Sequence, residues 1–304
     1  MDTTIKRGTL CSLDSLEADE DMYGTATRVD TWLILEYNGR WSGEAFRDSQ
    51  IPENAKARIS RYMETRPNSR LQLVKKQEQS MDGIKLYIAR SEERKPRLYE
   101  FTINKYEELL ELELDIDTLI KDGSSERREP IFLICTNGEH DRCCGKFGMP
   151  VFLDIAQGAN SADALQTTHI GGHRFSTTFV CLPHGLYYGR VREGKRAEEI
   201  IDEYKNGKID LGSYRGRSCY NPPVQTAEYF LRKETGLRNI SDLYIKEARE
   251  NDGEVNVEFF AGAEEKIFNV SLRKLDNAWR VLKSCGDKER SFIPRYSLLS
   301  IGAV

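Results

Sequence analysis

The 304-residue chain lacks several features that would assign it to a familiar class of protein. No apolar run approaches the roughly 18 residues that cross a membrane, and the start, MDTTIKRGTL, lacks the apolar core of a secretion signal. Charge of one sign is also lacking, because 45 basic and 49 acidic residues leave a net charge of −4. This balance argues against nucleic-acid binding. We therefore expect a cytoplasmic protein with neither a membrane nor a nucleic acid as its partner.

Cysteine is present in an odd number, seven, without the regular spacing of a secreted disulfide framework. Such usage agrees with a reducing compartment, where thiols bind metals or are simply buried. A phosphate-binding loop is also missing. The stretch from Gly138 to Gly145-Lys146 has two residues too many between its glycines, and Phe147 stands where Ser or Thr is needed.

What the chain does have is a concentration of soft metal ligands. All four histidines and four of the cysteines lie between residues 135 and 184: Cys135, His140, Cys143, Cys144, His169, His173, Cys181 and His184. Cys135 and Cys144 enclose eight residues, and His169 and His173 enclose three. Thiolate and imidazole together suit zinc, copper or an iron–sulfur cluster, whereas calcium and magnesium prefer oxygen ligands.

The spacing of these ligands favours a loop around something larger than one ion. The apolar run 131–134 predicts a buried strand, with Cys135 at its end and the Cys143–Cys144 pair across the following turn. A zinc finger would have closer cysteines and would carry its histidines on a helix, but here two glycines lie between His169 and His173. A [2Fe–2S] cluster is a larger object, and in some such clusters two His replace two Cys.

Several motifs make the sequence resemble a known family. They are CTNGxxDxCCG, HIGGHRF, LPHGxxYGR and YRGRS, in this order, with Cys11-Ser12 and Gly24-Thr25-Ala26 upstream. The sequence resembles the sucrase/ferredoxin-like family, a group of thioredoxin-like [2Fe–2S] ferredoxins, over roughly residues 8 to 236. The resemblance implies that Cys135, Cys144, His169 and His173 bind the cluster, with Cys144 preferred to Cys143 because it precedes Gly145. No specific carboxylate pair supports sugar hydrolysis.

His140 and His184 are expected to be hydrogen-bonded loop histidines, because four ligands are already implied. For His184, between Pro183 and Gly185, contact with a ligand is the alternative. The remaining cysteines have no partner at ligand spacing, and we expect them to be buried small residues. They are Cys11, Cys181, Cys219 and Cys285.

The motif Tyr214-Arg215-Gly216-Arg217-Ser218 presents two guanidinium groups that could hold an anion or an acidic partner. A solvated loop, or salt bridges to the body of the protein, is the favoured interpretation.

The hydrophobic pattern predicts an α/β fold in three parts. Residues 1–125 form an N-terminal α/β domain with the order β-α-β-β-β-α, preceded by an arm or loop over 1–21. Residues 126–239 form the thioredoxin-like ferredoxin domain, which begins after the polar segment 121–130. Residues 240–304 form a small β-rich C-terminal appendage. Within the second part we expect a strand over 174–182 and helices over 151–158, 196–204 and 222–235, the last capped by Asn221 and ended by Gly236.

These patterns predict an electron-transfer iron–sulfur protein rather than an enzyme with a substrate of its own. Neutral imidazole ligands would also allow proton-coupled one-electron transfer. A reductase and an acceptor protein would be its partners. Two alternatives stay open: a structural zinc site on the same four ligands, and a metal-free dithiol oxidoreductase that uses Cys143 and Cys144. The dithiol ranks last, because vicinal cysteines form a strained disulfide.

Overall fold

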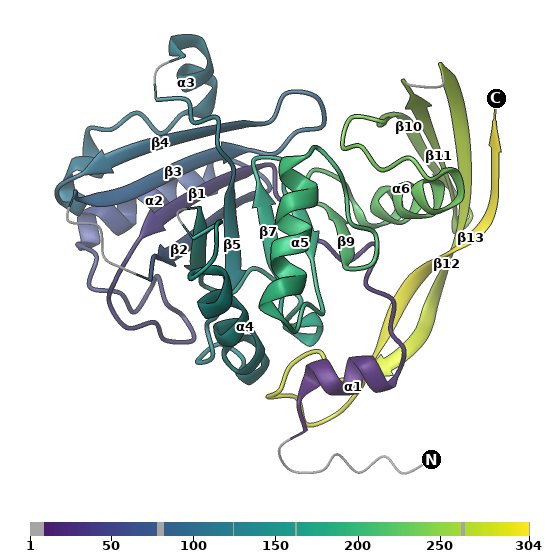
Figure 1. The fold of residues 1–304 in the computed structure, drawn as a ribbon, viewed down its shortest axis with the longest axis horizontal. Coiled ribbons are helices and arrows are strands. Elements are labelled where there is room, and N and C mark those ends of the chain that lie inside the picture. The colour runs from purple at the N-terminus through teal and green to yellow at the C-terminus, as the bar shows by residue number, and fades with distance from the viewer. Residues whose placement is uncertain (1–8, 78–81, 124, 162, 263–264, 304) are drawn as a thin grey trace.

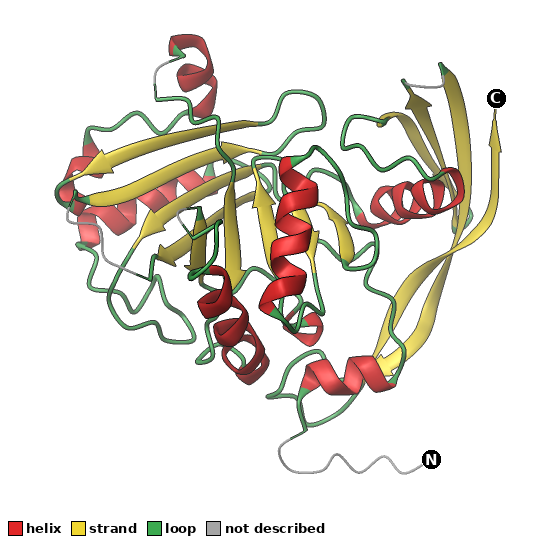
Figure 2. Ribbon diagram, in the orientation of Figure 1, coloured by secondary structure: helices red, strands yellow, loops and turns green. Residues whose placement is uncertain are grey.

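The computed structural model describes residues 9–77, 82–123, 125–161, 163–262 and 265–303. It confirms a mixed α/β fold, with a curled nine-stranded sheet and a separate four-stranded sheet (Figures 1 and 2). The large sheet has the strand order β4-β3-β1-β2-β6-β5-β7-β8-β9. None of the helices in the described part of the chain is long and apolar enough to cross a membrane.

The two halves of the large sheet have the same order of elements. The first half contains β1 (Thr31–Glu36), α2 (Glu53–Glu64), β2 (Ser69–Lys75), β3 (Ile84–Arg90), β4 (Arg97–Ile103), the 3-10 turn η1 (Tyr106–Leu110) and α3 (Ile116–Asp122). The second half contains β5 (Ile131–Cys135), α4 (Arg142–Ile155), β6 (Ala164–Thr167), the 3-10 turn η2 (His173–Phe175), β7 (Phe179–Leu182), β8 (Leu186–Tyr188) and α5 (Gly194–Lys205).

Strand pairing in the two halves is also the same. In the first half, β1 is parallel to β2 and antiparallel to β3, which is antiparallel to β4. In the second half, β5 is parallel to β6 and antiparallel to β7, which is antiparallel to β8. An antiparallel contact between β2 and β6 joins the halves. A β-α-β-β-β-α arrangement therefore occurs twice in one sheet.

The side chains of each half alternate between two cores. On β1, Leu33 and Leu35 pack in the core that contains α2, and on β5, Phe132 and Ile134 pack in the core that contains α4 and α5. The opposite faces of both halves contribute to one shared core, which includes Trp32, Leu133 and Cys135. The end of β5 therefore delivers Cys135 into the interior between the two halves.

The segment 121–130, predicted as the boundary between the first two domains, connects α3 to β5. It is attached to both halves: the Arg127 backbone N–H donates to Leu98 O (2.7 Å), and its guanidinium bonds Asp163 (2.6 Å). The division at residue 125 stays a prediction, and the sheet is continuous across it.

The rest of the chain forms the far edge of the large sheet and the second sheet. After β9 (Tyr214–Arg217), α6 (Pro222–Thr235) lies beside a sheet of β10 (Leu243–Asn251), β11 (Glu254–Ala261), β12 (Lys266–Val281) and β13 (Ser291–Ala303) (Figure 1). The predicted cap and stop of α6 are confirmed, because the Asn221 side chain accepts from Val224 N–H and Gly236 has a φ of 75°. The β-rich character of the C-terminal part is confirmed as well.

Three local predictions were wrong. Part of the expected arm over 1–21 is the helix α1 (Cys11–Glu17). Residues 1–8, which include most of the segment considered as a secretion signal, lie outside the described residues. Helix α4 begins at Arg142, well before the predicted residue 151, because Asp141 caps it by accepting from Cys143 N–H. Strand β7 begins at Phe179 rather than 174, since the chain first makes the turn η2.

Arg217 belongs to a wholly buried ionic network rather than to an anion site. Its Nε lies 2.8 Å from Glu228 Oε1, which Arg232 also contacts at 3.1 Å. Tyr214 donates its hydroxyl to the other carboxylate oxygen of Glu228 at 2.9 Å. One carboxylate thus pairs with two guanidinium groups between β9 and α6, and the favoured interpretation of the arginine motif is confirmed for Arg217.

Replacing Glu228→Gln should lower the free energy of unfolding by about 3–5 kcal/mol, because two buried guanidinium groups lose their counter-charge. Chemical denaturation followed by circular dichroism measures this. The control Glu247→Gln breaks an exposed pair with Arg249 and should leave stability nearly unchanged. Equal effects of the two changes would contradict the importance of the buried network.

Candidate metal centre

Three of the sequence-predicted ligands meet at one edge of the large sheet. Cys135 ends β5, Cys144 lies in the first turn of α4, and His169 follows β6. Because β5 and β6 are parallel, their carboxyl ends lie at the same edge, and the chain after each strand brings a ligand there. The ligand atoms of the three residues all lie within 4.8 Å of one another, and Cys144 Sγ is 3.8 Å from His169 Nδ1.

His173 lies next to this group. Its ring centroid is 4.8 Å from that of His169, and its Nε2 is 3.9 Å from Asp141 Oδ2. Its other nitrogen, Nδ1, is buried and has no hydrogen-bond partner within the described ranges. A buried polar nitrogen is nearly always paired, so this one is available as a metal ligand. The structure therefore brings three of the predicted ligands together and places the fourth, His173, beside His169 with a buried nitrogen that a metal could satisfy.

His140 contributes a third imidazole that the sequence did not single out. Its Nδ1 is 3.0 Å from Gly43 O, as expected for a hydrogen-bonded loop histidine. Its ring also stacks on His169 with centroids 4.1 Å apart, and His140, His169 and His173 have nitrogens within 4.8 Å of one another. The only available signal was its position between the two cysteines.

Side-chain donors bind the backbone carbonyl groups of the loop that carries the two histidines of the predicted ligand set. Arg70 donates to His169 O at 2.6 Å, and Tyr187 donates its hydroxyl to Ile170 O at 3.2 Å. Arg215, the other guanidinium of the arginine motif, donates to Gly171 O at 3.1 Å. Donors from both halves of the sheet thus fix the loop backbone before any ligand is bound.

Gly172 is where this loop comes closest to Arg215. Its φ is 75°, and a Cβ there would lie 2.3 Å from an Arg215 guanidinium nitrogen. Gly207 has a nearly identical φ of 73° with no heavy atom within 4 Å of such a Cβ. The two glycines therefore separate the effect of close packing from that of backbone conformation.

Gly207→Ala should cost about 1–2 kcal/mol of stability from its left-handed backbone alone. Gly172→Ala should cost clearly more, because it also displaces the Arg215 guanidinium, and it should reduce the metal retained on purification. Chemical denaturation and metal analysis of both variants measure this. Equal losses of stability and full metal retention in both would contradict the role assigned to the Gly172 contact.

The electrostatics of the site favour the metal-binding forms of Cys135 and His173. A hydrogen bond from Cys144 lowers the pKa of Cys135 well below its usual value, and His169 and the Ile170 N–H act in the same direction, against the effect of burial. The same bond raises the pKa of Cys144. Burial, followed by the neighbouring His169, lowers the pKa of His173. A thiolate at Cys135 and a neutral His173 imidazole are the forms that bind metals.

Cys143 points to a different group from that of its neighbour Cys144. Its Sγ lies 3.6 Å from Cys11 Sγ and 3.3 Å from Cys285 Sγ, and Asp141 completes the group. The prediction that Cys11 and Cys285 lack partners was therefore wrong, because residues far apart in the sequence meet here. Cys181 is buried as expected, and Cys219 is partly exposed.

His184 lies apart from these groups, where its Nδ1 meets the Tyr204 hydroxyl at 2.7 Å. Burial lowers its pKa from 6.5 to about 4. In the unfolded chain His184 is protonated below about pH 6.5, whereas in the folded protein it is protonated only below about pH 4. Stability is unaffected by this group above pH 6.5 and falls as the pH drops through that window.

Acidification from pH 6.5 to 4 should cost about 3 kcal/mol of stability through His184, and His184→Gln should remove this component. Urea denaturation of both proteins across that range measures it. Parallel curves of stability against pH for the two proteins would show that His184 is not the responsible group.

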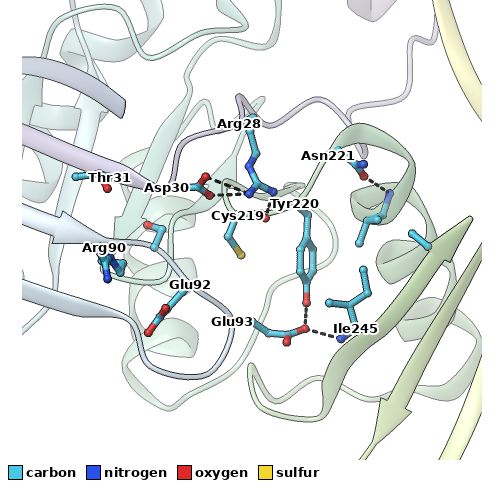
Figure 3. Close-up of a pocket in the computed structure, with 13 residues that line it drawn as sticks. Arg28, Asp30, Thr31, Arg90, Glu92, Glu93, Cys219, Tyr220, Asn221 and Ile245 are labelled. Atoms are coloured by element: carbon cyan, nitrogen blue, oxygen red, sulfur yellow. Dashed lines mark hydrogen bonds and ion pairs between the residues drawn. The ribbon is translucent and has the colours of Figure 1, made fainter. Parts of the chain in front are cut away.

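Two surface cavities differ in their relation to the site. A depression of about 310 Å³ is lined by His140 and His169 together with Phe46, Arg47 and Arg70. A larger cavity of about 590 Å³ lies between Arg28, Tyr220 and the start of β10, where the Tyr220 hydroxyl bonds the Glu93 carboxylate (Figure 3). The larger cavity has no ligand histidine in its lining, so only the smaller one opens onto the metal centre.

The fold and the site thus define a mixed α/β protein with cysteine and histidine groups that could hold a metal. The model of the sucrase/ferredoxin-like family matches residues 22–216, more than half of the chain. The chain therefore belongs to the sucrase/ferredoxin-like family, as its motifs indicated. No curated protein and no solved structure matches the chain.

Proposed function

We propose that this protein is an electron carrier that holds one [2Fe–2S] cluster on Cys135, Cys144, His169 and His173. The observation that carries the proposal is the meeting of Cys135, Cys144 and His169, with His173 beside His169 and its buried Nδ1 left without a partner in the described part of the chain. The ferredoxin-like family and the repeated β-α-β-β-β-α order, which thioredoxin-like folds use, give further support.

The cluster would supply one-electron chemistry, and the protein would bind it and set its potential through ligand type, hydrogen bonds and burial. Cys135 and Cys144 are buried in the shared core, and the Ile170 N–H donates to the Cys135 sulfur. A hydrogen bond to a ligand sulfur stabilises its negative charge and so favours the reduced state. His169 lies at the surface depression, which gives a partner reductase or acceptor an approach on the imidazole side.

In this proposal, the proton that couples to electron transfer would be carried by Nε2 of His173. When His173 binds through Nδ1, its Nε2 keeps a proton and faces the Asp141 carboxylate at 3.9 Å. A proton on Nε2 is held more tightly when the ligand group carries more negative charge, so electron uptake favours proton retention there. Asp141 would be the nearest carboxylate to favour that proton.

A structural zinc ion is the second candidate, because Cys135, Cys144 and His169 lie as close together as the ligands of one ion require even without His173. A dithiol function has less support, since Cys143 and Cys144 belong to different groups.

Anaerobically purified protein should be coloured and contain about two irons and two acid-labile sulfides per chain. Absorption and electron paramagnetic resonance spectra, with iron and sulfide analysis, measure this. A colourless protein with zinc on Cys135, Cys144 and His169 would overturn the proposal in favour of the second candidate.

Cys144→Ser should abolish or strongly destabilise the cluster, because the variant loses a ligand sulfur. Cys143→Ser is the matched control and should keep the colour and the iron, since that sulfur points to the other group. Iron content and visible spectra of the two variants decide the matter. The reverse pattern would mean that Cys143 is the ligand.

A further inference from the structure

Three cysteines from distant parts of the chain meet beside the proposed cluster. Cys11 starts α1, Cys143 lies in the first turn of α4, and Cys285 lies in the loop between β12 and β13. Their sulfurs form a triangle with edges of 3.6 Å, 3.3 Å and 3.6 Å. Asp141 lies over the same point, with its oxygens 3.7 Å and 3.9 Å from Cys11 Sγ. Figure 1 shows the β12–β13 loop beside α1.

These distances match the edges of a metal tetrahedron. Zinc binds sulfur at about 2.3 Å and oxygen at about 2.0 Å, which places tetrahedral sulfurs about 3.8 Å apart and sulfur and oxygen about 3.5 Å apart. A disulfide would instead bring one pair of sulfurs to about 2.05 Å and exclude the third. Three nearly equal edges are therefore what a single ion needs.

The Asp141 carboxylate accepts three hydrogen bonds and keeps one lone-pair site that could bind an ion. Oδ2 accepts from the Ser284 hydroxyl (3.0 Å) and the Cys285 N–H (2.8 Å). Oδ1 accepts from the Cys143 N–H (2.9 Å) and faces the Cys11 sulfur. A carboxylate offers about four lone-pair sites, so the backbone and hydroxyl donors leave one free on Oδ1. The side chain itself is fully buried.

Hydrogen-bond donors surround two of the three sulfurs, those of Cys143 and Cys285. The hydroxyl and backbone N–H of Ser12 donate to Cys143, and the Cys11 N–H donates to Cys285 Sγ at 3.4 Å. Cys143 also lies in the first turn of α4, where the helix dipole favours negative charge. Hydrogen bonds of this kind orient and stabilise the ligands of bound metals.

From this arrangement we infer a structural zinc site formed by Cys11, Cys143, Cys285 and Asp141. All four positions of the tetrahedron are supplied by the protein, which is the pattern of structural rather than catalytic zinc. None of these four residues is a proposed ligand of the cluster, so this site is additional to it. The ion joins α1, α4 and the β12–β13 loop, and it gives the adjacent Cys143 and Cys144 separate metals.

The inference is tested by counting zinc and iron in the full chain after anaerobic purification. We expect about one zinc per chain, lost in Cys285→Ser and Cys11→Ser, with the iron unaffected. Asp141→Asn should weaken zinc retention against a chelator by about tenfold or more. Cys219→Ser is the matched control, because Cys219 belongs to neither group, and it should retain the zinc. Zinc that survives the Cys11 and Cys285 changes would overturn the inference.

X-ray absorption at the zinc edge of the unmodified protein tests the ligands without depending on a variant that folds. We expect three sulfurs and one oxygen around the zinc. Two sulfurs with one or two nitrogens would place zinc on Cys135, Cys144 and His169, which overturns the proposed function as well as this inference. Two irons without zinc, with a Cys11–Cys143, Cys143–Cys285 or Cys11–Cys285 disulfide in the mass spectrum, would overturn this inference alone.

Discussion

The buried carboxylate of Asp141 connects three segments that have no sequence proximity. It caps α4 through Cys143, it accepts from Ser284 and Cys285 in the β12–β13 loop, and it faces His173 Nε2. A carboxylate removed from water is destabilising unless it is paired, so these contacts stabilise one another. The positions of the two cysteine groups on either side of Asp141 follow from this requirement.

The repeated β-α-β-β-β-α arrangement places the loop after β1 in the first half against the cysteine loop of the second half. In the second half, the chain after β5 makes the cysteine loop and continues into α4. In the first half, the equivalent segment between β1 and α2 contributes Gly43, whose carbonyl meets His140, and Ser42, whose carbonyl accepts from Asn137 at 3.0 Å. The second half therefore supplies the predicted ligands, and the β1–α2 segment of the first half packs against their loop.

Sequence patterns predicted the elements whose signals are local. The strands were identifiable from apolar and alternating residues, and α6 from Asn221 and Gly236. The spacing of the cysteines and histidines also indicated which of them to compare in the fold. The start of α4 was missed because Gly145, Gly148 and Pro150 are poor helix formers, but close packing requires these glycines: a Cβ at Gly148 would lie 2.0 Å from Cys135 O. Helix α1 was missed because the residues that it buries are mostly polar.

The group of Cys11, Cys143 and Cys285 could not be predicted from local sequence patterns. Cys11 and Cys285 are 274 positions apart, and only the completed fold brings them together. Their partners in the surrounding contacts are equally distant, since Asp14 of α1 accepts from Leu282 N–H at 2.7 Å and pairs with Arg290. No spacing rule connects residues of this kind.

The contact between α1 and the β12–β13 loop sets an order for biosynthesis. As the chain leaves the ribosome, α1 appears early but has none of its partners in that loop until nearly the whole protein has been made. During that interval Asp14 and Cys11 stay hydrated, and the loop beside His173 has not yet closed. The group formed by Cys11, Cys143 and Cys285 can therefore assemble only after most of the chain has been made.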